Sequence, residues 1–422
     1  MTVTVHRHTS CTTVWAPDQR KKDEPCSFDP TSSSARTWRQ SIRAYLLPLI
    51  AQETPWLVSL QHRLRPHDAT ERPTRATQWL DHYFVVTSLL GNHNFFLLFL
   101  PVLFWLGWGL FTRTFVTVIL GSIYWSGCAK DWLALPRPPA PPLNRLTWSK
   151  SHGFEYGFPS SHTSYMISVA LFLGQQAVTS EWSAPWAPFK TACLVLLALL
   201  TATIIFGRLY CGMHSVTDIV GGALLGTWWW AVVYAFMPAF DQYLTSGHSS
   251  VPLTTAAVTG FMAYILPRPQ GPCPCFKDSY ACLGVLAGIW VATWRFAHHP
   301  VAAGVGFPLA TIRYEYATLG LRITMLRIVT GLGILLIWKT LAQAALAAVV
   351  SACLPGPQQV TLTKAQMNTA TDESPKKPTP PDPTLYYIQN ICRIVVYGGV
   401  GFIACFTAPV SFEILGLGLG QL

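Results

Sequence analysis

Long apolar runs alternate with short polar segments along most of this chain. From about residue 95 onward the runs recur, separated by stretches rich in charged residues, proline or glycine. A helix of about 20 apolar residues can cross a bilayer, because it satisfies its own backbone hydrogen bonds. The pattern therefore predicts an all-α protein, a polytopic transmembrane helical bundle. The expected spans are 95–111, 114–129, 163–178, 190–206, 219–236, 252–266, 280–297, 323–353 and 391–418.

The pattern is less regular before residue 95. Residues 1–40 are rich in Ser, Thr, Arg and Lys and are predicted to be disordered. Residues 41–62 mix apolar positions with Arg43 and Glu53, which favours an interfacial amphipathic helix over a clean span. The segment 84–111 contains a Gly-Asn-His-Asn interruption, so it holds either one crossing or a broken pair.

Composition supports the membrane assignment. Hydrophobic residues make up 51% of the chain and charged residues only 11%, whereas charged residues are roughly a quarter of a soluble domain. The net charge of +10 lies largely in the N-terminal segment and in short loops, which suits a positively charged membrane face better than nucleic-acid binding. The eleven cysteines form neither a paired disulfide framework nor a convincing metal site.

The polar segment 207–218, between two apolar runs, carries the most suggestive chemistry. Arg208, His214 and Asp218 lie here, and the i,i+4 spacing of the last two places them on one helix face. The carboxylate can then accept one imidazole N–H and leave the other ring nitrogen as a nucleophile, while the arginine binds an anion. Capping or snorkelling polar groups at a membrane edge are the alternative interpretation.

Two further polar clusters border the neighbouring runs. Lys130 and Arg137 can converge on one anion, or they can simply form the positive flank of a membrane helix. Ser160, Ser161 and His162 open the run at 163–178, where the helix N-terminus suits a phosphate oxygen and the histidine can pass a proton to a leaving group. Ordinary helix capping by the serines is the alternative.

Parity of the crossings brings the three clusters together. Because 163–178 and 190–206 cross in opposite directions, all three clusters reach the same membrane face. Several cations, two histidines and an orienting carboxylate suit phosphoryl transfer to a histidine. No carboxylate cluster suited to Mg²⁺ or Ca²⁺ accompanies them, so we expect no metal and no other cofactor. Gly222 and Gly226 form a small-xxx-small face that would hold the helix after His214 close to a neighbour, although chance tolerance of glycine is as good an explanation.

These motifs resemble those of the type 2 phosphatidic-acid-phosphatase superfamily (PAP2). The family pattern K-x6-R-P, P-S-G-H and S-R-x5-H-x3-D reads here as KDWLALPRP, PSSH and GRLYCGMHSVTD, in the same order and with the same spacing. Ser161 replaces the central glycine and Gly207 replaces the serine before the arginine. The first change keeps a backbone N–H, whereas the second removes a hydroxyl, so Gly207 is not expected to bind phosphate.

The resemblance implies a set of site roles. His214 would attack phosphorus, Asp218 would orient it, and His162 would act as general acid and then general base. The residues implied to bind phosphate are Lys130, Arg137, Ser160, Ser161 and Arg208.

The phrases CAKDWLALPRPPAPP, EYGFPSSH and RLYCGMHSVTDIVGG resemble the branch that acts on sphingoid long-chain base 1-phosphates. The resemblance thus implies a phosphatase in sphingolipid metabolism, embedded in the endoplasmic-reticulum membrane with a lumenal site. Two alternatives are another lipid phosphatase, acting on phosphatidate or a polyprenyl diphosphate, and a non-catalytic lipid-phosphate binding or transport protein. The sequence does not address the oligomeric state.

The predicted organisation has five parts. They are a polar N-terminal segment with the interfacial helix (1–77), the PAP2-like catalytic membrane core (78–240), additional transmembrane helices (241–353), a flexible polar linker (354–386) and a C-terminal transmembrane helix (387–422).

Overall fold

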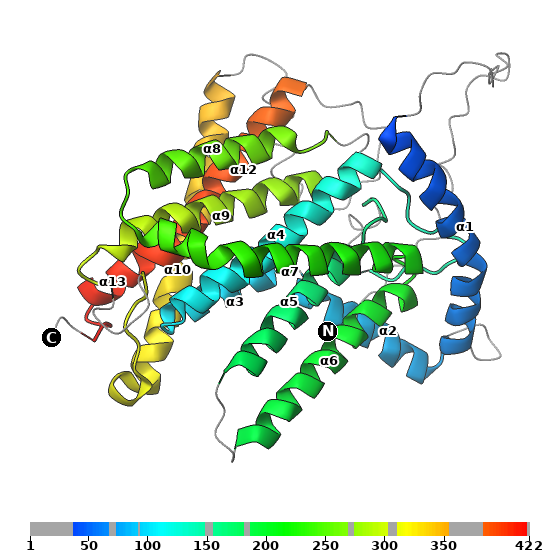
Figure 1. Ribbon diagram of the computed structural model, residues 1–422, viewed down its shortest axis with the longest axis horizontal. Coiled ribbons are helices and arrows are strands. Elements are labelled where there is room, and N and C mark those ends of the chain that lie inside the picture. The colour runs from blue at the N-terminus through cyan, green and yellow to red at the C-terminus, as the bar shows by residue number, and fades with distance from the viewer. Residues whose placement is uncertain are drawn as a thin grey trace. The chain divides into compact units, whose positions relative to one another are not determined.

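The computed structural model describes residues 37–66, 73–91, 93–147, 155–180, 186–268, 274–302, 310–353 and 383–419. Within these ranges the chain is helical, with isolated β-bridges but no β-strand (Figure 1). The all-α prediction is therefore confirmed. The helices are α1 (Trp38–Leu64), α2 (Arg75–Thr87), η1 (Ser88–Gly91), α3 (His93–Trp105), α4 (Gly109–Leu133), α5 (Ser161–Thr179), α6 (Ala187–Tyr210), α7 (Val216–Thr245), α8 (Ser250–Ile265), α9 (Cys275–Ala297), α10 (Tyr316–Cys353), α12 (Pro383–Phe402), η4 (Ile403–Thr407) and α13 (Ala408–Ile414).

Five stretches in the described part of the chain are long and apolar enough to cross a membrane. They are Ala187–Tyr210, Val216–Thr245, Cys275–Ala297, Tyr316–Val350 and Ile388–Ile414. Many of their large apolar side chains are exposed, among them Leu196 and Leu224. Contact of these apolar side chains with lipid tails is favourable, whereas their contact with water costs free energy. The prediction of a transmembrane bundle is therefore confirmed.

The chain divides into two compact units. The first comprises the described residues of Met1–Asn92, Ser126–Thr227 and Pro267–Cys275, and the second those of His93–Trp125, Trp228–Leu266 and Phe276–Leu422. All of the predicted site residues belong to the first unit.

In the first unit, α5 and α6 pack side by side and the start of α7 packs closely on α5 (Figure 1). A Cβ atom on Gly222 would lie 2.5 Å from the carbonyl oxygen of Ser160, and one on Gly226 would overlap the backbone of Ser164. The Ser168 hydroxyl donates to the Gly226 carbonyl at 2.7 Å. The predicted close approach at the two glycines is thus confirmed.

Helix α1 contacts the loops of the same unit. Arg43 donates through Nη1 to the carbonyl oxygens of Leu133 and Ala134, just after α4 ends. At the other end of α1, Gln61 donates through Nε2 to the carbonyl oxygen of Tyr210 at 2.9 Å, where α6 ends. The helix therefore ties together two segments that carry predicted site residues.

In the second unit, Arg113 and Asp241 form a two-point ion pair. Its N–O distances are 2.6 and 2.9 Å, and Nη1 of the arginine also donates to the carbonyl oxygen of Ala310 at 3.1 Å. A buried charge is tolerated only with such partners. The pair therefore fixes α4 against α7 within this unit.

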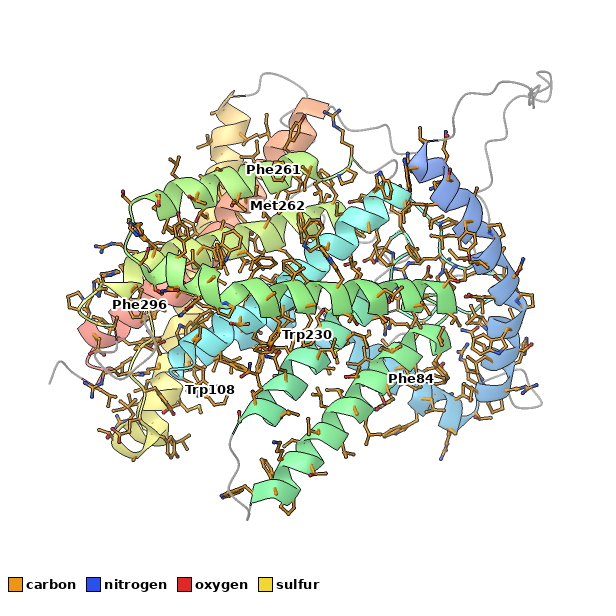
Figure 2. The ribbon with its side chains drawn as sticks, in the orientation of Figure 1. Phe84, Trp108, Trp230, Phe261, Met262 and Phe296 are labelled. Atoms are coloured by element: carbon orange, nitrogen blue, oxygen red, sulfur yellow. The ribbon has the colours of Figure 1, made fainter. Side chains whose placement is uncertain are left out.

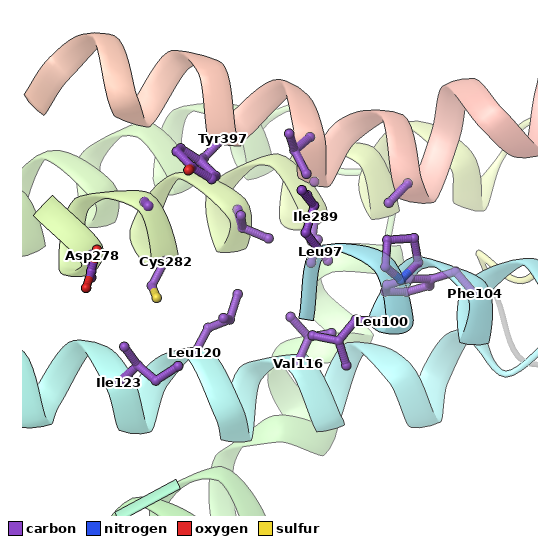
Figure 3. A pocket seen from close by; sticks show the side chains of 16 residues that line it. Leu97, Leu100, Phe104, Val116, Leu120, Ile123, Asp278, Cys282, Ile289 and Tyr397 are labelled. Carbon is purple, nitrogen blue, oxygen red and sulfur yellow. The ribbon is translucent and has the colours of Figure 1, made fainter. Parts of the chain in front are cut away.

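A small cavity of about 70 Å³ lies between α3, α4, α9 and α12 of the second unit. Its lining is almost entirely aliphatic and aromatic, with Asp278, Cys282 and Tyr397 towards one end and Phe104 towards the other (Figure 3). It carries none of the predicted site residues.

The expected span at 95–111 is wrong. Helix α3 ends at Trp105, the chain turns at Gly107 with φ of +82°, and α4 begins at Gly109. The 13 residues of α3 extend roughly 20 Å, which is less than the roughly 30 Å of a bilayer's hydrocarbon core. Apolar content alone concealed the break, because a glycine inside an apolar run looks like part of the run.

Candidate active site

The three predicted polar clusters meet in the first unit. Lys130 lies in the last turn of α4, Ser160 caps α5, and Arg208 lies in the last turn of α6. His214 lies in the turn between α6 and α7, and Asp218 in the first turn of α7. Segments up to about 90 residues apart in sequence thus surround one imidazole.

Asp218 faces His214 as the i,i+4 spacing predicted. The Nδ1 atom of the imidazole lies 3.5 Å from Oδ2 of the carboxylate. The same oxygen accepts the backbone N–H of Ser215 at 2.8 Å, and the Ser215 hydroxyl accepts the backbone N–H of Asp218 at 3.1 Å. The aspartate therefore takes part in the cap at the start of α7 and faces the histidine at once, so the geometry is compatible with both the capping and the orienting interpretation.

Arg137 approaches the other side of the imidazole. Its Nη1 lies 3.0 Å from Nε2 of His214 and donates to the carbonyl oxygen of Met213 at 2.7 Å. A guanidinium can only donate hydrogen bonds, so Nε2 must carry the lone pair and Nδ1 the proton. This tautomer directs the N–H towards Asp218 and keeps a nucleophilic nitrogen on the side of the cations.

Burial and positive charge keep His214 neutral. Burial lowers the pKa of its imidazole well below the usual value, and Arg137, Lys130, Arg208 and His162 lower it further. The imidazole therefore carries a lone pair across the physiological pH range.

Ser160 links the starts of α5 and α7. Its backbone N–H donates to the carbonyl oxygen of Asp218 at 3.0 Å. Its hydroxyl oxygen accepts from the backbone N–H of Thr163 at 3.4 Å and from the Thr163 hydroxyl at 3.0 Å. The predicted helix cap is confirmed, and the hydroxyl proton of Ser160 can still be donated.

The remaining residues of the second cluster are less directly engaged. Ser161 and His162 begin α5 and are half-buried. Nε2 of His162 lies 3.4 Å from the carbonyl oxygen of Ser88. Its charge is one of those that lower the pKa of His214. For the Ser161 hydroxyl, the described residues provide no hydrogen bond to another site residue.

Arg208 is buried with an unused donor. Its Nε has no hydrogen-bond partner among the described residues. Its carbonyl oxygen accepts the backbone N–H groups of Met213 and His214 at 3.0 and 3.4 Å, which closes the turn that holds the imidazole. An unpaired buried donor costs about 1–3 kcal/mol, so the site is suited to an incoming anion.

Glu155 lies in the site although it belongs to none of the three motifs. One carboxylate oxygen, Oε2, lies 3.2 Å from Nζ of Lys130 and 2.9 Å from Nη2 of Arg137. Its backbone carbonyl also accepts from Nε of Arg137 at 3.0 Å. The available signal was the position of this carboxylate at the start of the phrase EYGFPSSH, shortly before the polar residues that were expected to lie near Lys130 and Arg137.

Glu53 is a second contributor that the motifs did not indicate. Its carboxylate accepts the backbone N–H of Thr217 at 3.1 Å and the Thr217 hydroxyl at 2.5 Å, at the N-terminus of α7. The partners are 164 residues apart in sequence, so no local pattern could reveal the contact.

Gly207 stands where the family pattern has a serine, and the packing around it leaves no room for a side chain. A Cβ atom there would lie 2.9 Å from Cδ1 of Phe84, a residue of α2 that Figure 2 labels. The same ring packs at a tilt of 38° against Tyr210, one turn later on α6, with 4.6 Å between the ring centroids. The Phe84 ring therefore occupies the space that a side chain at position 207 would need.

An apolar groove borders the site. It has a volume of about 580 Å³ and runs between α5, α6 and α7. Its lining includes Leu209 and Val216, which are next in sequence to Arg208 and one residue from Ser215. An aliphatic chain in the groove could thus begin close to the cationic site.

In the described ranges, no group of three or more His, Cys, Asp or Glu side chains could hold a metal ion. The positive charge of the site comes from Lys130, Arg137 and Arg208.

Similar proteins bear on what this site does. A family model described as the PAP2 superfamily matches residues 103–242. Dihydrosphingosine 1-phosphate phosphatase C823.11 of Schizosaccharomyces pombe is 31% identical over 92% of this chain and 93% of its own length. Dihydrosphingosine 1-phosphate phosphatase YSR3 of Saccharomyces cerevisiae is 33% identical over 72% and 70% of the two chains. Sphingosine-1-phosphate phosphatase 2 of Homo sapiens is 29% identical over 50% and 51%.

No solved structure gives a significant match to this chain. The family match covers the segments that bear all three motifs, and the first relative aligns over nearly the whole chain. Together with the apolar helices, these matches identify a multi-pass membrane protein. The chain belongs to the PAP2 superfamily of phosphatases.

Proposed function

We propose that this protein hydrolyses sphingoid long-chain base 1-phosphates to the free base and inorganic phosphate, with His214 as the nucleophile. The observation that carries the chemistry is the position of the imidazole between Asp218 and Arg137, with distances of 3.5 and 3.0 Å. The substrate class rests on the names of the relatives that align over most of the chain.

In the first step, Nε2 of His214 attacks phosphorus and the bond to the ester oxygen breaks. The electron pair leaves with that oxygen, which takes a proton from His162. Asp218 stabilises the positive charge that develops on the imidazole, while Lys130, Arg137 and Arg208 neutralise the phosphoryl oxygens.

In the second step, water attacks the phosphohistidine and His162 accepts its proton. Inorganic phosphate leaves and His214 returns to its neutral state. Splitting the reaction in this way suits phosphate monoesters, whose uncatalysed hydrolysis is among the slowest known. Ser160 and Ser161 are proposed to donate hydrogen bonds to the phosphoryl group.

The apolar groove supports a single-chain lipid substrate. It is lined by α5 and by α6 and α7, which are long and apolar enough to cross a membrane, and it reaches Leu209 and Val216 beside the site. An alkyl chain could enter it from the bilayer while the phosphate meets the cations.

We also propose that the protein resides in the endoplasmic-reticulum membrane with the site on the lumenal side. The arginines at 63–75 favour a cytosolic N-terminal segment, although Arg65 is buried in an ion pair with Asp81 and counts less towards that rule. A fluorescent fusion and protease protection of tags at either end would test both statements.

The decisive experiment is phosphate release by detergent-purified protein. Sphingoid base phosphates, phosphatidate and a polyprenyl diphosphate would be compared, with His214→Ala as the negative control. The variant should lose roughly 10³-fold or more in rate, as loss of a covalent nucleophile does. Faster hydrolysis of phosphatidate or of the diphosphate would mean that the substrate is not a sphingoid base phosphate. Absence of turnover of every lipid would favour a non-catalytic lipid-phosphate binding or transport protein.

A further inference from the structure

Glu155 places a negative charge inside a site built for an anion. Its Oε2 lies 2.9 Å from Nη2 of Arg137 and 3.2 Å from Nζ of Lys130. A phosphate group that binds these two cations would have to take the same position. The carboxylate must then move aside, and it would lie beside the phosphate as a repelling charge unless something positive meets it.

The three side chains differ in how far they are exposed. The side chains of Lys130 and Arg137 are 1% and 3% exposed, whereas that of Glu155 is 18% exposed. The carboxylate is therefore the member of this group that an entering molecule meets first.

Arg137 does not depend on this carboxylate for its position. Its Nη1 donates to the carbonyl oxygen of Met213 at 2.7 Å, and its Nε donates to the backbone carbonyl of Glu155 at 3.0 Å. These two bonds remain when the Glu155 side chain turns away. They also hold the backbone at position 155 beside the site.

The proposed substrate supplies a charge for the displaced carboxylate. In a sphingoid base 1-phosphate the amine stands on the carbon next to the one that bears the phosphate, and it is protonated near neutral pH. The headgroup thus presents a dianion and a cation side by side. Lys130 and Arg137 carry the charge that complements the phosphate, and Glu155 carries the charge that complements the ammonium group.

We infer that Glu155 determines specificity by binding the ammonium group of the substrate, after the phosphate has displaced its carboxylate from Lys130 and Arg137. This inference rests on the proposed function, because it names the part of the same substrate that the site selects. A lipid phosphate without an amine brings no positive group to the displaced carboxylate. The site therefore disfavours phosphatidate.

The test compares two substrates that differ in one charge. One is a sphingoid base 1-phosphate, and the other is its N-acetyl derivative, whose nitrogen is neutral. In the wild-type protein we expect kcat/KM to favour the free amine by roughly 10- to 100-fold, the range of one hydrogen bond to a charged group. In Glu155→Gln this ratio should fall to near one, mainly through loss of activity on the free amine.

Glu155→Asp is the matched control, because it retains the charge on a shorter side chain and should retain a preference for the amine. Equal losses on both substrates in Glu155→Gln would mean that the residue only positions the cations, which would overturn the inference. A wild-type protein that hydrolyses both substrates equally well would overturn it too. Failure of the wild type to hydrolyse either one would instead refute the proposed function.

If Glu155→Gln is inactive, binding of the two substrates' analogues can be compared instead of their hydrolysis. The non-hydrolysable phosphonates of both substrates would then be added to purified wild type and variant, and the shift in unfolding temperature measured. The wild type should be stabilised more by the free amine, and the variant equally by both. A variant that keeps the wild-type difference would contradict the inference.

Discussion

Nη1 of Arg137 lies 3.0 Å from Nε2 of His214, on the ring nitrogen that faces away from Asp218. The contact fixes the tautomer of the imidazole, because the guanidinium has no lone pair to offer. It also occupies the lone pair that would attack phosphorus. Substrate binding must therefore break the contact between Nη1 and Nε2 before the reaction can begin, while the bond from Nη1 to the carbonyl oxygen of Met213 can remain.

The first prediction concerns pH. Burial and the surrounding cations lower the pKa of His214 well below its usual value, so the nucleophile stays deprotonated as the pH falls through about 6.5, the ordinary pKa of a histidine side chain. We therefore expect kcat/KM to fall through protonation of His214 only at a pH well below this value. A pH–rate profile of purified protein with a soluble substrate analogue measures it.

A Lys130→Met variant provides the matching control. Removing one of the cations should raise the pKa of His214 and move the acid limb upward, because less positive charge then opposes protonation. An acid limb at the usual histidine pKa in the wild type, unmoved in the variant, would contradict this account.

The lowered pKa of His214 also makes the free energy of unfolding depend on pH. The unfolded chain binds a proton on this histidine at a higher pH than the folded chain does. Stability is therefore lost as the pH falls through the unfolded value towards the lowered folded one.

Asp218→Asn should lower kcat far more than it changes KM. The amide keeps the shape but cannot stabilise the imidazolium, and it can present an N–H to Nδ1 and reverse the tautomer. A loss of about 10²- to 10⁴-fold is expected, by analogy with carboxylates that orient catalytic histidines. Steady-state kinetics with a sphingoid base phosphate would measure the two constants separately.

Thr217→Val serves for comparison with this variant. It removes a hydroxyl that donates to Glu53 in the same turn of α7 without touching the imidazole, so its kcat should stay much closer to the wild type. Similar losses of kcat in the two variants would mean that Asp218 acts only by capping its helix.

The order of polar clusters along the sequence was enough to predict much of this site. The spacings of Lys130 to Arg137 and of His214 to Asp218 are local, so motifs express them directly. The apolar runs likewise predicted most of the helices. Parity then predicted that the start of α5 and the segment 207–218 lie together, and the bond from Ser160 to Asp218 confirms this.

What the sequence could not predict depends on contacts between distant segments. Glu53 reaches the start of α7 from α1, and Phe84 of α2 covers Gly207. Neither contact has a periodic or local signal. The break at Gly107 was missed for a different reason, since a left-handed turn of one residue does not interrupt an apolar run.

Chelation should leave the activity intact. The cations of the site are side chains, Lys130, Arg137 and Arg208, which EDTA does not remove. Phosphate release after dialysis against EDTA should match the untreated protein, with added Mg²⁺ producing no more than a twofold change. An absolute requirement for Mg²⁺ would count strongly against the proposed chemistry.

Gly207→Ser restores the residue typical of the family and should destabilise this protein. The new Cβ atom would lie 2.9 Å from the Phe84 ring, and overpacking of this kind costs about 1–3 kcal/mol. The midpoint of thermal unfolding in detergent should fall. Adding Phe84→Leu should recover part of the loss, because it removes the ring that the serine meets, whereas purely additive losses in the double variant would contradict the packing explanation.

Gly226→Ala should separate α7 from α5 and reduce both stability and activity. The added methyl group overlaps the backbone of Ser164, which cannot rotate away as a side chain could. Gly174→Ala on α5 is the matched control, since a Cβ atom there meets nothing within 4 Å and alanine favours a helix by about 1 kcal/mol over glycine. Unfolding temperatures and kcat should therefore drop in the first variant, while the second keeps or gains stability. Equal behaviour of the two alanines would show that the close approach of α5 and α7 contributes nothing to holding His214 in place.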